Sequence, residues 1–436
     1  MEPVTATIEN LSHDGRGVAR VNGKTVFVSG ALPAEIVQFQ IVRKRNQFDE
    51  AETIEILNPS PHRQQPRCSH FGNCGGCSLQ HFDLPEQLGH KQQTLQNLLK
   101  YQAKTAPLAW LTPISSPSWG YRRKARLGVK FIAKKNKLVI GFRERQGRLI
   151  TDCHQCEVLI PAVGKHLNEL AELITALSIK DQIPQIEVAA GDNAVALIIR
   201  HLADFSSQDF ILIKEFAKTR GNDSLRIYLQ RHGTDSVQLF YPEQADPLYY
   251  VLPRYDLKLE FQPLQFIQIN ASVNVKMIDL ALELLDCQPN DRILDLFCGI
   301  GNFSLPIAKR GANVTGVEGD AAAVTQATHN ARLNQLSHCE FYCQDLFQKD
   351  FSAAWSQRQY DKILLDPPRS GAQNIVESID RWRPRRIVYI SCDLATLARD
   401  CVFLQDHHYQ LQKAGIMDMF PHTQHAEAIA LFELRG

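Results

Sequence analysis

The feature that most constrains this chain is a regular alternation of strand and helix patterns from about residue 265 to its end. Apolar runs typical of strands cover 291–298, 313–318, 340–343, 361–366, 386–392 and 427–434, with helical patterns between most of them. Such an alternation is typical of a doubly wound parallel sheet. Open α/β sheets bind ligands at the carboxyl ends of their strands, so the residues that follow each strand are the first candidates for a functional site.

The remainder of the chain shows two other patterns. Short alternating runs punctuated by glycine over residues 1–58 favour a small OB-like β-barrel, and the Pro-rich segment 58–66 indicates a linker. Strand-like and helical runs are mixed in the region that follows. We therefore predict an α/β and β multi-domain protein, with the barrel over 1–58, an α+β central domain over 59–264 and the α/β domain over 265–436.

The first strand of the α/β domain runs directly into the glycine turn 299–301, which lets a ligand approach the backbone closely. Glu318 ends the second strand, at the distance where an acid binds ribose hydroxyls. Ser304 stands where a dinucleotide-binding loop has its third glycine, so S-adenosylmethionine fits this loop better than NAD. A lone Gly-x-Gly also occurs as a structural turn, and it is Glu318 and the sheet context that favour a nucleotide-type ligand.

Two further acidic residues follow strands of this domain. Asp345 comes after the third strand, where we expect it to meet the adenine of the ligand. Asp366, in ILLDPPRSG, lies at the end of the fourth strand, at the edge where ligands bind. Asp-Pro-Pro in such a place recurs in methyltransferases that act on bases.

The fifth strand delivers Cys392 to the same edge, ahead of a helix. Buried cysteines are usually core residues, but a helix N-terminus lowers the pKa of a thiol and favours the thiolate. A thiolate suits methylation of uracil at C5, because its addition at C6 makes C5 nucleophilic and a base must then remove the C5 proton. Glu427, at the start of the last strand, is the candidate base, although without Cys392 it would be an ordinary strand-edge acid.

The chain has 11 cysteines and begins with no recognisable secretory signal. We therefore expect a cytoplasmic protein, in which cysteines serve metal binding or catalysis before disulfides. Cys68, Cys74 and Cys77 lie in one glycine-rich loop, which indicates a metal site, and Cys156 is a fourth candidate ligand. Their spacing fits zinc as well as a [4Fe–4S] cluster, because both accept four thiolates.

Charge is distributed unevenly along the chain. The whole chain has 48 Lys and Arg against 47 Asp and Glu, but residues 122–148 contain eleven basic residues and one acid, Glu144. This basic segment predicts a contact with nucleic-acid phosphates, with Tyr121, Phe131 and Phe142 as stacking surfaces; a solvated hairpin would carry the same charge. No apolar run approaches the roughly 20 residues of a membrane span, so we expect no membrane partner.

Five motifs, in this order along the chain, resemble the S-adenosylmethionine-dependent RNA uracil-5 methyltransferases. They are FIQIN (266–270), LDLFCGIGNFSLPIA (294–308), LLDPPRSG (364–371), SCDLATLARD (391–400) and MFPHTQHAE (419–427). The N-terminal segment resembles a TRAM domain, and the cysteine loop resembles that of the iron–sulfur branch of the family. The likeness covers essentially the whole chain and is greatest to the branch that methylates bacterial 23S ribosomal RNA.

The resemblance implies specific roles for individual residues. Cys392 would be the nucleophile and Glu427 the base, and Cys156 is preferred to Cys153 as the fourth ligand of a [4Fe–4S] cluster. The residues that match the cofactor site of the family are Gln268, Phe297, Asn302, Glu318, Asp345 and Asp366. The implied methyl donor is S-adenosylmethionine and the implied partner is 23S ribosomal RNA, whose target base must leave its stack. We expect the enzyme to act as a monomer.

One motif departs from the family pattern. The family's Ser-Cys-Asn-Pro is Ser-Cys-Asp-Leu here, with Asp393 and Leu394 in the last two places. The lost proline could loosen the loop that aims the thiol. Asp393 adds an anion close to the thiol, which would oppose formation of the thiolate.

Three other functions fit parts of this pattern. Cytosine-5 RNA methyltransferases also use a thiolate, but their usual Thr-Cys and Pro-Cys pairs are absent from this chain. A methyltransferase of the adenine amino group would need neither Cys392 nor Glu427. The alternative outside enzymes is a non-catalytic RNA-binding iron–sulfur protein, which would have no reason to keep the glycine loop, nucleophile and base together.

Overall fold

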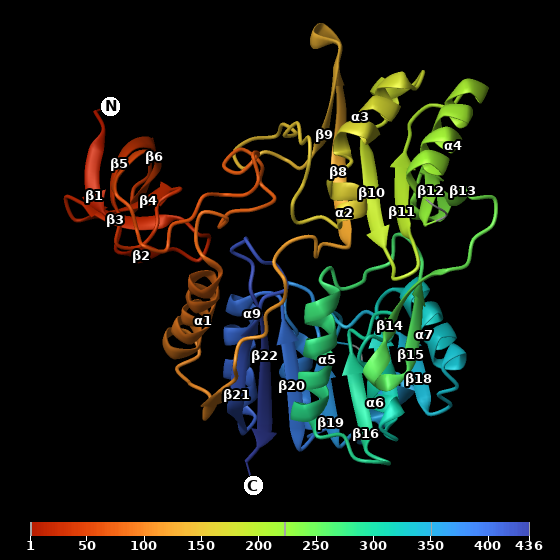
Figure 1. The fold of residues 1–436 in the computed structure, drawn as a ribbon. Coiled ribbons are helices and arrows are strands. Elements are labelled where there is room, and N and C mark those ends of the chain that lie inside the picture. Colours follow the sequence, from red (N-terminus) through yellow and green to blue (C-terminus); the bar gives the residue numbers. More distant parts are fainter. Residues whose placement is uncertain (1, 222–223, 350, 436) are drawn as a thin grey trace.

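The structure is a computed structural model that describes residues 2–221, 224–349 and 351–435. Its N-terminal unit is a sheet of six strands (Figure 1). The strands pair in the order β1-β5-β6-β4-β3-β2, and alternating apolar side chains such as Val26, Val28 and Phe39 form the buried core. The all-β segment predicted from the glycine-punctuated runs is therefore present, and its closure into an OB-like barrel stays a prediction. The strands are β1 (Val4–Thr7), β2 (Asn10–Leu11), β3 (Gly17–Val21), β4 (Lys24–Ser29), β5 (Ile36–Lys44) and β6 (Phe48–Asn58).

The Pro-rich segment after β6 is fixed to this unit by a buried carboxylate. Glu35 accepts hydrogen bonds from the backbone amides of Leu32 at 2.8 Å and Ser60 at 3.1 Å. The Arg63 guanidinium donates to both Glu35 oxygens, at 2.6 and 2.8 Å, and to the Gly30 carbonyl at 2.7 Å. These contacts fix the start of the predicted linker against the N-terminal unit at the point where the chain leaves it.

The central region contains a second sheet of six strands, in the order β13-β12-β11-β10-β8-β9. All neighbours are antiparallel except β11 and β12, and α3 and α4 pack on the sheet around one apolar core. The basic segment 122–148 forms the hairpin of β8 and β9 and the loop that follows. The elements are β8 (Lys124–Ile132), β9 (Lys137–Gly141), α2 (Pro161–Gly164), α3 (Leu167–Ala176), β10 (Gln185–Ala190), β11 (Val195–Arg200), α4 (Ser207–Gly221), β12 (Leu225–Gln230) and β13 (Val237–Tyr241).

The C-terminal sheet has eight strands in the order β18-β17-β16-β19-β20-β22-β21-β7. The first five in that order are parallel, as predicted, but β22 is antiparallel to β20 and β21 is antiparallel to β22. The prediction of a parallel sheet is therefore confirmed for these five strands and wrong for β22. The physical reason is the connection 418–426, which contains no crossover helix and can join only antiparallel strands.

The bounds of the C-terminal elements agree with the predicted strands to within one or two residues at most ends, and β21 is the strand that the sequence pattern missed. None of the described helices is long and apolar enough to cross a membrane. The strands are β14 (Leu248–Leu252), β15 (Leu257–Phe261), β16 (Arg292–Leu296), β17 (Asn313–Glu318), β18 (Cys339–Cys343), β19 (Lys362–Leu365), β20 (Arg386–Ser391), β21 (Tyr409–Met417) and β22 (Glu427–Leu434). The helices are α5 (Ala271–Leu285), α6 (Ser304–Lys309), α7 (Ala321–Leu333), α8 (Gln373–Val376) and α9 (Leu394–Asp406), and 3₁₀ turns lie at 133–135, 180–182, 234–236, 253–255, 354–357 and 379–381.

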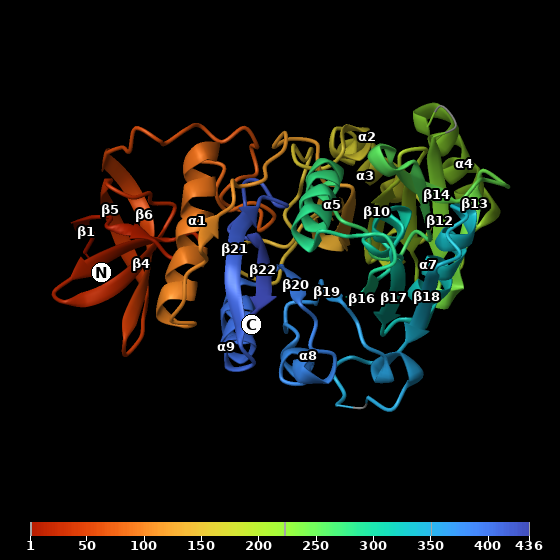
Figure 2. The ribbon, with the colours of Figure 1, turned by 90° about the horizontal axis from the view of Figure 1, so that it is seen from below.

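Four elements from the range predicted for the central domain lie with the C-terminal domain instead, and two of them, β14 and β15, form a two-stranded sheet that packs against α7. Strand β7 (Ala109–Trp110) pairs with β21, and helix α1 (Leu84–Tyr101) packs against α9 and β21. Figure 2 shows α1 between the N-terminal sheet and the C-terminal sheet. The buried face of α1 carries two polar side chains, Gln87 and Lys91, beside Leu95 and Leu99.

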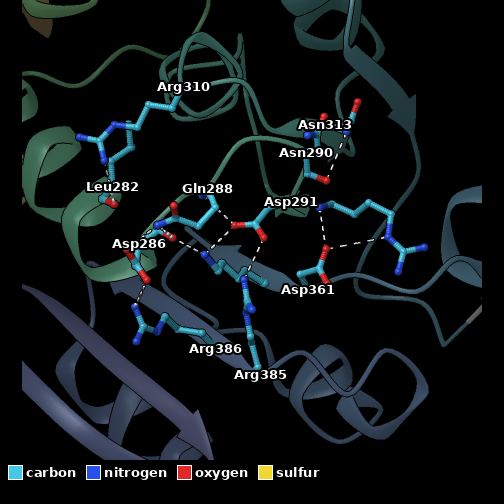
Figure 3. Close-up of polar contacts among 12 residues, drawn as sticks. Leu282, Asp286, Gln288, Asn290, Asp291, Arg310, Asn313, Asp361, Arg385 and Arg386 are labelled. Atoms are coloured by element: carbon cyan, nitrogen blue, oxygen red, sulfur yellow. Dashed lines mark hydrogen bonds and ion pairs between the residues drawn. The ribbon is translucent and has the colours of Figure 1, made fainter.

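The amino edge of the C-terminal sheet is closed by a network of charged side chains (Figure 3). The Asp291 carboxylate pairs with Lys362 at 2.6 Å and with Arg385 at 2.8 Å, and it accepts a hydrogen bond from the Gln288 amide at 2.8 Å. Lys362 and Asp291 are both buried, and pairing is what makes buried charges tolerable. This network ties together the starts of β16, β19 and β20, at the edge opposite the glycine loop.

Candidate active site

The loop after β16 brings backbone to the carboxyl edge of the C-terminal sheet. Phe297, Gly299 and Gly301 have φ angles of 65°, 53° and 93°, in the left-handed region that glycine adopts without strain. A Cβ on Gly301 would lie 2.3 Å from Cδ1 of Leu305, whereas a Cβ on Gly299 would meet nothing within 4 Å. A side chain at Gly301 would be strained by this φ and would displace the end of the Leu305 side chain on α6, whereas Gly299 borders open space that a ligand can enter.

Glu318, at the end of β17, lies beside this loop. One of its carboxylate oxygens accepts a hydrogen bond from the Gly299 amide at 3.1 Å. The other accepts from the amides of Gly319 at 2.7 Å and Asp320 at 3.0 Å. The predicted ribose acid is thus held at the glycine loop by backbone donors.

Buried carboxyl groups gather around the same loop. Burial raises the pKa of Asp295 to about 7. The hydrogen bond from Ser304 lowers this pKa, and the nearby Glu318 charge raises it further. Burial and then the charges of Asp295 and Glu318 likewise raise the pKa of Asp366 to about 7. Within the described part of the chain, Oδ1 of Asp295 is buried without a hydrogen-bond partner. Clustered acids of this kind favour a bound cation, so the site fits the sulfonium group of S-adenosylmethionine.

Asn302 and Gln268 share neighbours on the other side of the glycine loop. Asn302 accepts a hydrogen bond from the Tyr250 hydroxyl at 2.9 Å and exchanges two with the Asn274 amide, at 2.9 and 3.0 Å. Gln268 lines a hollow of about 710 Å³ together with Tyr250 and Asn274. Sequence reasoning missed Tyr250 and Asn274, which orient Asn302 from β14 and α5.

The remaining predicted cofactor residues flank the open side of the loop. The Phe297 ring lies 5.8 Å from the Phe347 ring. The exposed Asp345 carboxylate accepts hydrogen bonds from the Phe347 amide at 2.9 Å and the Gln348 side chain at 3.0 Å. The structure therefore brings Phe297, Asn302, Glu318, Asp345 and Asp366 to one edge of the sheet, with Gln268 next to it.

Cys392 and Glu427 face each other across two neighbouring strands. Cys392 directly follows β20, Glu427 begins β22, and the last paired residues of these antiparallel strands are Ser391 and Ala428. The charges of Glu427 and Asp366 act on the Cys392 thiol, and the charge of Asp366 acts on Glu427. The candidate nucleophile, the candidate base and the Asp-Pro-Pro loop thus meet at the carboxyl edge.

The Cys392 thiol is not held as a thiolate. Burial raises its pKa to about 11, the Glu427 and Asp366 carboxylates add to the rise, and Arg369 opposes it. The prediction that the helix start lowers the pKa of this thiol is therefore wrong. Burial and two facing carboxylates outweigh the helix.

Asp393 caps the helix that follows Cys392, a role that was not predicted from the sequence. Its carboxylate accepts hydrogen bonds from the amides of Ala395 at 3.0 Å and Thr396 at 3.1 Å, so it is the N-cap of α9. Asn and Asp are equally good N-cap residues. The departure from the family pattern therefore preserves the start of the helix.

Glu427 is buried, and among the described residues no group donates a hydrogen bond to its Oε2. Burial raises the pKa of Glu427 to about 8, the Asp366 charge raises it further, and the Lys91 ammonium lowers it. A base whose pKa lies near the working pH is suited to proton transfer. Lys91 lies on α1, and the sequence did not identify it as a neighbour of the site. Its position four residues from Gln87 and four from Leu95 places it on the buried face of the helix, and that spacing was the available signal.

The four predicted metal ligands, Cys68, Cys74, Cys77 and Cys156, line one hollow of about 400 Å³. Cys153 also lines it and donates a hydrogen bond to the Cys74 sulfur, which lowers the pKa of Cys74. Burial raises the pKa of Cys77 to about 12 and of Cys156 to about 11. In the described ranges, no set of three or more His, Cys, Asp or Glu side chains is arranged to hold a metal ion. The structure thus gathers the thiols in one hollow without forming a closed metal site.

A groove of about 2080 Å³ runs between the N-terminal sheet, the cysteine loop, the loop 142–146 that follows β9 and the 420–425 segment that precedes Glu427. The basic side chains that line it are Arg16, Arg43, Arg122, Arg126, Arg143, Arg145 and Arg369. Asp14, Glu50 and Glu144 are its acidic side chains. A groove with this excess of arginine is suited to a phosphate backbone.

The aromatic side chains of the basic segment are less accessible for stacking on bases than predicted. Tyr121 is buried, and its hydroxyl donates to the Pro421 carbonyl at 3.1 Å. The Phe142 ring faces the groove, with the Arg122 guanidinium 5.5 Å from its centre. The prediction of Tyr121 as a stacking surface is therefore wrong, because this side chain fixes the 420–425 segment instead.

The parallel strands, the glycine loop, the acid after the second strand and the Asp-Pro-Pro loop define an S-adenosylmethionine-dependent methyltransferase. The family model for tRNA (uracil-5-)-methyltransferases matches residues 85–435, and the model for the TRAM domain matches residues 2–54. The chain belongs to this family, and it is an S-adenosylmethionine-dependent RNA methyltransferase. This membership confirms the resemblance drawn from the five motifs.

The chain is similar to curated proteins along almost its whole length. It is 45% identical over 433 residues to the 23S rRNA (uracil(1939)-C(5))-methyltransferase RlmD of Methylococcus capsulatus, covering 99% of this chain and 97% of that one. It is 46% identical over 437 residues to the protein of the same name from Xanthomonas campestris, covering 99% and 98%. The crystal structure of Pyrococcus abyssi tRNA (uracil-54, C5)-methyltransferase in complex with S-adenosyl-L-homocysteine has the same fold, with a TM-score of 0.75, 24% identity and coverage of 98% and 100%.

The cap role of Asp393 makes a prediction about stability. Asp393→Ala should lower the free energy of unfolding by about 1 kcal/mol, because two amides at the start of α9 lose their acceptor. Asp393→Asn, which restores the family residue, should leave it unchanged. Urea denaturation followed by circular dichroism measures both variants, and equal losses for Ala and Asn would contradict the cap assignment.

Proposed function

We propose that this enzyme transfers a methyl group from S-adenosylmethionine to C5 of a uridine in 23S ribosomal RNA, through a covalent adduct between Cys392 and C6 of the base. The observation that carries the proposal is the opposition of Cys392 and Glu427 at the edge where the glycine loop opens. The names of the relatives support 23S ribosomal RNA, and a uridine equivalent to their position 1939, as the substrate. A ribosomal RNA substrate implies a cytoplasmic enzyme.

Two side chains of the chain perform the proposed chemistry. The Cys392 thiol loses its proton to water, so that Glu427 stays ionised, and the sulfur adds to C6 to form an enolate whose C5 is nucleophilic. S-adenosylmethionine supplies the methyl group that C5 takes. Glu427 then removes the C5 proton, the C5–C6 double bond forms again, and the Cys392 sulfur leaves C6.

Six residues are proposed to bind the methyl donor. Glu318 would bind the ribose, Asp345 the adenine edge and Asp366 the end that carries the sulfonium, because each lies at the strand end where that part of a bound nucleotide passes. The residues that complete the proposed site are Gln268, Phe297 and Asn302. The open space at Gly299 supports this assignment.

The arginine-lined groove is the proposed path of the RNA. Its basic side chains come from the N-terminal unit, from β8 and the residues that flank the β8–β9 hairpin, and from Arg369 after the Asp-Pro-Pro motif, so phosphates could be contacted on both sides of the target. Methylation at C5 requires the uridine to leave its stack. The ring of Phe266 is 70% exposed and could pack against the base.

The hollow lined by cysteines is proposed to hold a [4Fe–4S] cluster, with Cys68, Cys74, Cys77 and Cys156 as ligands. Four thiols from two separate loops suit such a cluster, and zinc would accept the same donors. The Gly76 amide already donates to the Cys74 sulfur at 3.4 Å, the kind of contact that tunes a thiolate ligand. Bound there, the group would link the 68–77 loop to the 153–156 loop.

The covalent mechanism predicts opposite effects for two substitutions. Cys392→Ala should abolish methylation while S-adenosylmethionine still binds, because only the nucleophile is lost. Glu427→Gln should accumulate a covalent protein–RNA adduct, since the C5 proton can no longer be removed. Cys401→Ala, which removes a buried cysteine from α9, the helix that follows Cys392, is the matched control and should keep activity. An active Cys392→Ala enzyme, or free turnover by Glu427→Gln, would refute the mechanism.

The raised pKa of Glu427 predicts a pH dependence of one step. Glu427 must be ionised to take the proton, and its pKa is about 8, so the rate of RNA release from the adduct should rise with pH and level off above about pH 8. At pH 6 most molecules carry a protonated Glu427 and release should be slowest. Rapid-quench measurement of adduct decay from pH 6 to 9 tests this, and a flat profile would exclude Glu427 as the base.

The metal proposal predicts the content of the purified enzyme. Anaerobically purified protein should contain about four iron and four sulfide per chain, and Cys156→Ser should lose them. Cys153→Ser should retain them, because Cys153 is not a proposed ligand. Zinc without iron would favour the zinc alternative, and retention of iron by Cys156→Ser would exclude Cys156 as the fourth ligand.

A further inference from the structure

The segment that delivers Glu427 to the site is the connection between β21 and β22, residues 418–426. Within it the Thr423 hydroxyl donates to the Phe420 carbonyl at 2.9 Å, and the His425 amide donates to the Thr423 hydroxyl at 3.2 Å. His422 has a φ of 67°, a conformation that most residues adopt only when their surroundings impose it. The neighbours of this segment therefore decide where Glu427 lies.

One of those neighbours is a buried lysine. The Lys91 ammonium, on α1, donates to the Asp418 carboxylate at 2.7 Å and to the Phe420 carbonyl at 3.1 Å. The Lys91 side chain is 1% exposed and that of Asp418 is 4% exposed. A buried ion pair contributes little or nothing to stability compared with apolar residues of the same volume, so stability alone does not account for a lysine here.

A buried glutamine one turn earlier holds the middle of the segment. The Gln87 side-chain oxygen accepts from the His422 amide at 2.9 Å, while its nitrogen donates to the carbonyls of Leu79 at 2.9 Å and Phe82 at 2.7 Å. The His422 carbonyl in turn accepts from the amides of Ser78 and Leu79, both at 2.9 Å. Gln87 thus joins the segment to the chain that follows the cysteine loop.

Lys91 also acts on Glu427 through its charge. Burial raises the pKa of Glu427, the Asp366 charge adds to the rise, and Lys91 is the cation that lowers it. With an uncharged residue at position 91, a larger fraction of Glu427 would be protonated at neutral pH and unable to accept a proton.

We propose that Lys91 and Gln87 are positioning residues for the catalytic base, because they hold segment 418–426 so that Glu427 faces the carbon from which it takes the proton. The inference rests on the proposed role of Glu427. It assigns to α1, a helix outside the range predicted for the methyltransferase domain, a part in the last step of the reaction.

The test separates formation of the adduct from its release. Lys91→Met and Gln87→Leu each keep the side-chain volume and remove the hydrogen bonds to the segment. In single-turnover reactions with radiolabelled S-adenosylmethionine and a 23S ribosomal RNA fragment, both should transfer the methyl group at close to the wild-type rate. Release of the methylated RNA should slow by between about 10-fold and 100-fold, the cost of a misplaced catalytic group, so the adduct should accumulate on a denaturing gel.

The matched control is a second buried lysine–aspartate pair in the same domain. Lys362 is 1% exposed and its ammonium bonds to the Asp291 carboxylate at 2.6 Å, at the opposite edge of the sheet; Figure 3 labels Asp291. Lys362→Met should lower the unfolding temperature without changing the ratio of release to formation. Unfolding temperature and S-adenosylhomocysteine binding are measured for every variant, and Gln87→Leu decides the matter if Lys91→Met does not fold.

Glu427→Gln, run beside these variants, distinguishes the two ways of failing. If Glu427→Gln itself accumulates no adduct, the role of the base is wrong. If it does, but folded Lys91→Met and Gln87→Leu release RNA at the wild-type rate, or slow formation and release equally, the positioning inference is overturned.

Discussion

The antiparallel pairing of β22 with β20 is the constraint on which the proposed chemistry depends. It sets Ser391 opposite Ala428, and so the residue after β20 faces the residue that begins β22. A shift of one residue in this register would turn every side chain of β22 to the other face of the sheet. Strands β19 and β16, which follow β20 in the sheet order, bring the Asp-Pro-Pro loop and the glycine loop to the same edge, so one register relates the proposed nucleophile and base to the loop proposed to bind the cofactor.

Burial of acidic groups gives this edge its chemical character. Asp295, Asp366 and Glu427 all have a pKa raised by loss of water around the carboxyl group. Burial, and then the charges of Glu427 and Asp366, also raise the pKa of the Cys392 thiol, which opposes formation of the proposed nucleophile. A cationic methyl donor bound among the carboxylates would relieve their repulsion.

The sequence was informative about the C-terminal domain because each signal there is local. Buried parallel strands are continuous apolar runs, and the groups that follow them, such as Glu318 and Asp366, meet at one edge whatever the helices between them do. Cys392, which follows β20, could be placed at this edge for the same reason, whereas Glu427 lies there because β22 runs antiparallel to β20. Strand β21 was missed because its residues 409–417 mix polar and apolar side chains, as expected of a strand near the edge of the sheet.

The parts that could not be predicted depend on contacts between distant segments. Lys91 reaches Asp418 across more than 300 residues of chain, and a charged residue in a helix pattern normally indicates a solvated face. The pKa of Cys392 depends on which carboxylates face it, which requires the packed structure. Tyr121 looked like a stacking surface beside arginines, but its hydroxyl binds a backbone carbonyl of the 420–425 segment.

The central claim is that Cys392 forms a bond to the uracil that it methylates. The most direct test is mass spectrometry of the enzyme after reaction with S-adenosylmethionine and a 23S ribosomal RNA fragment that contains 5-fluorouridine. Fluorine at C5 cannot leave as a proton does, so the account predicts a stable adduct on the peptide that contains Cys392, bearing one added methyl group. An adduct on a different residue, or none when binding of S-adenosylmethionine is confirmed, would contradict it.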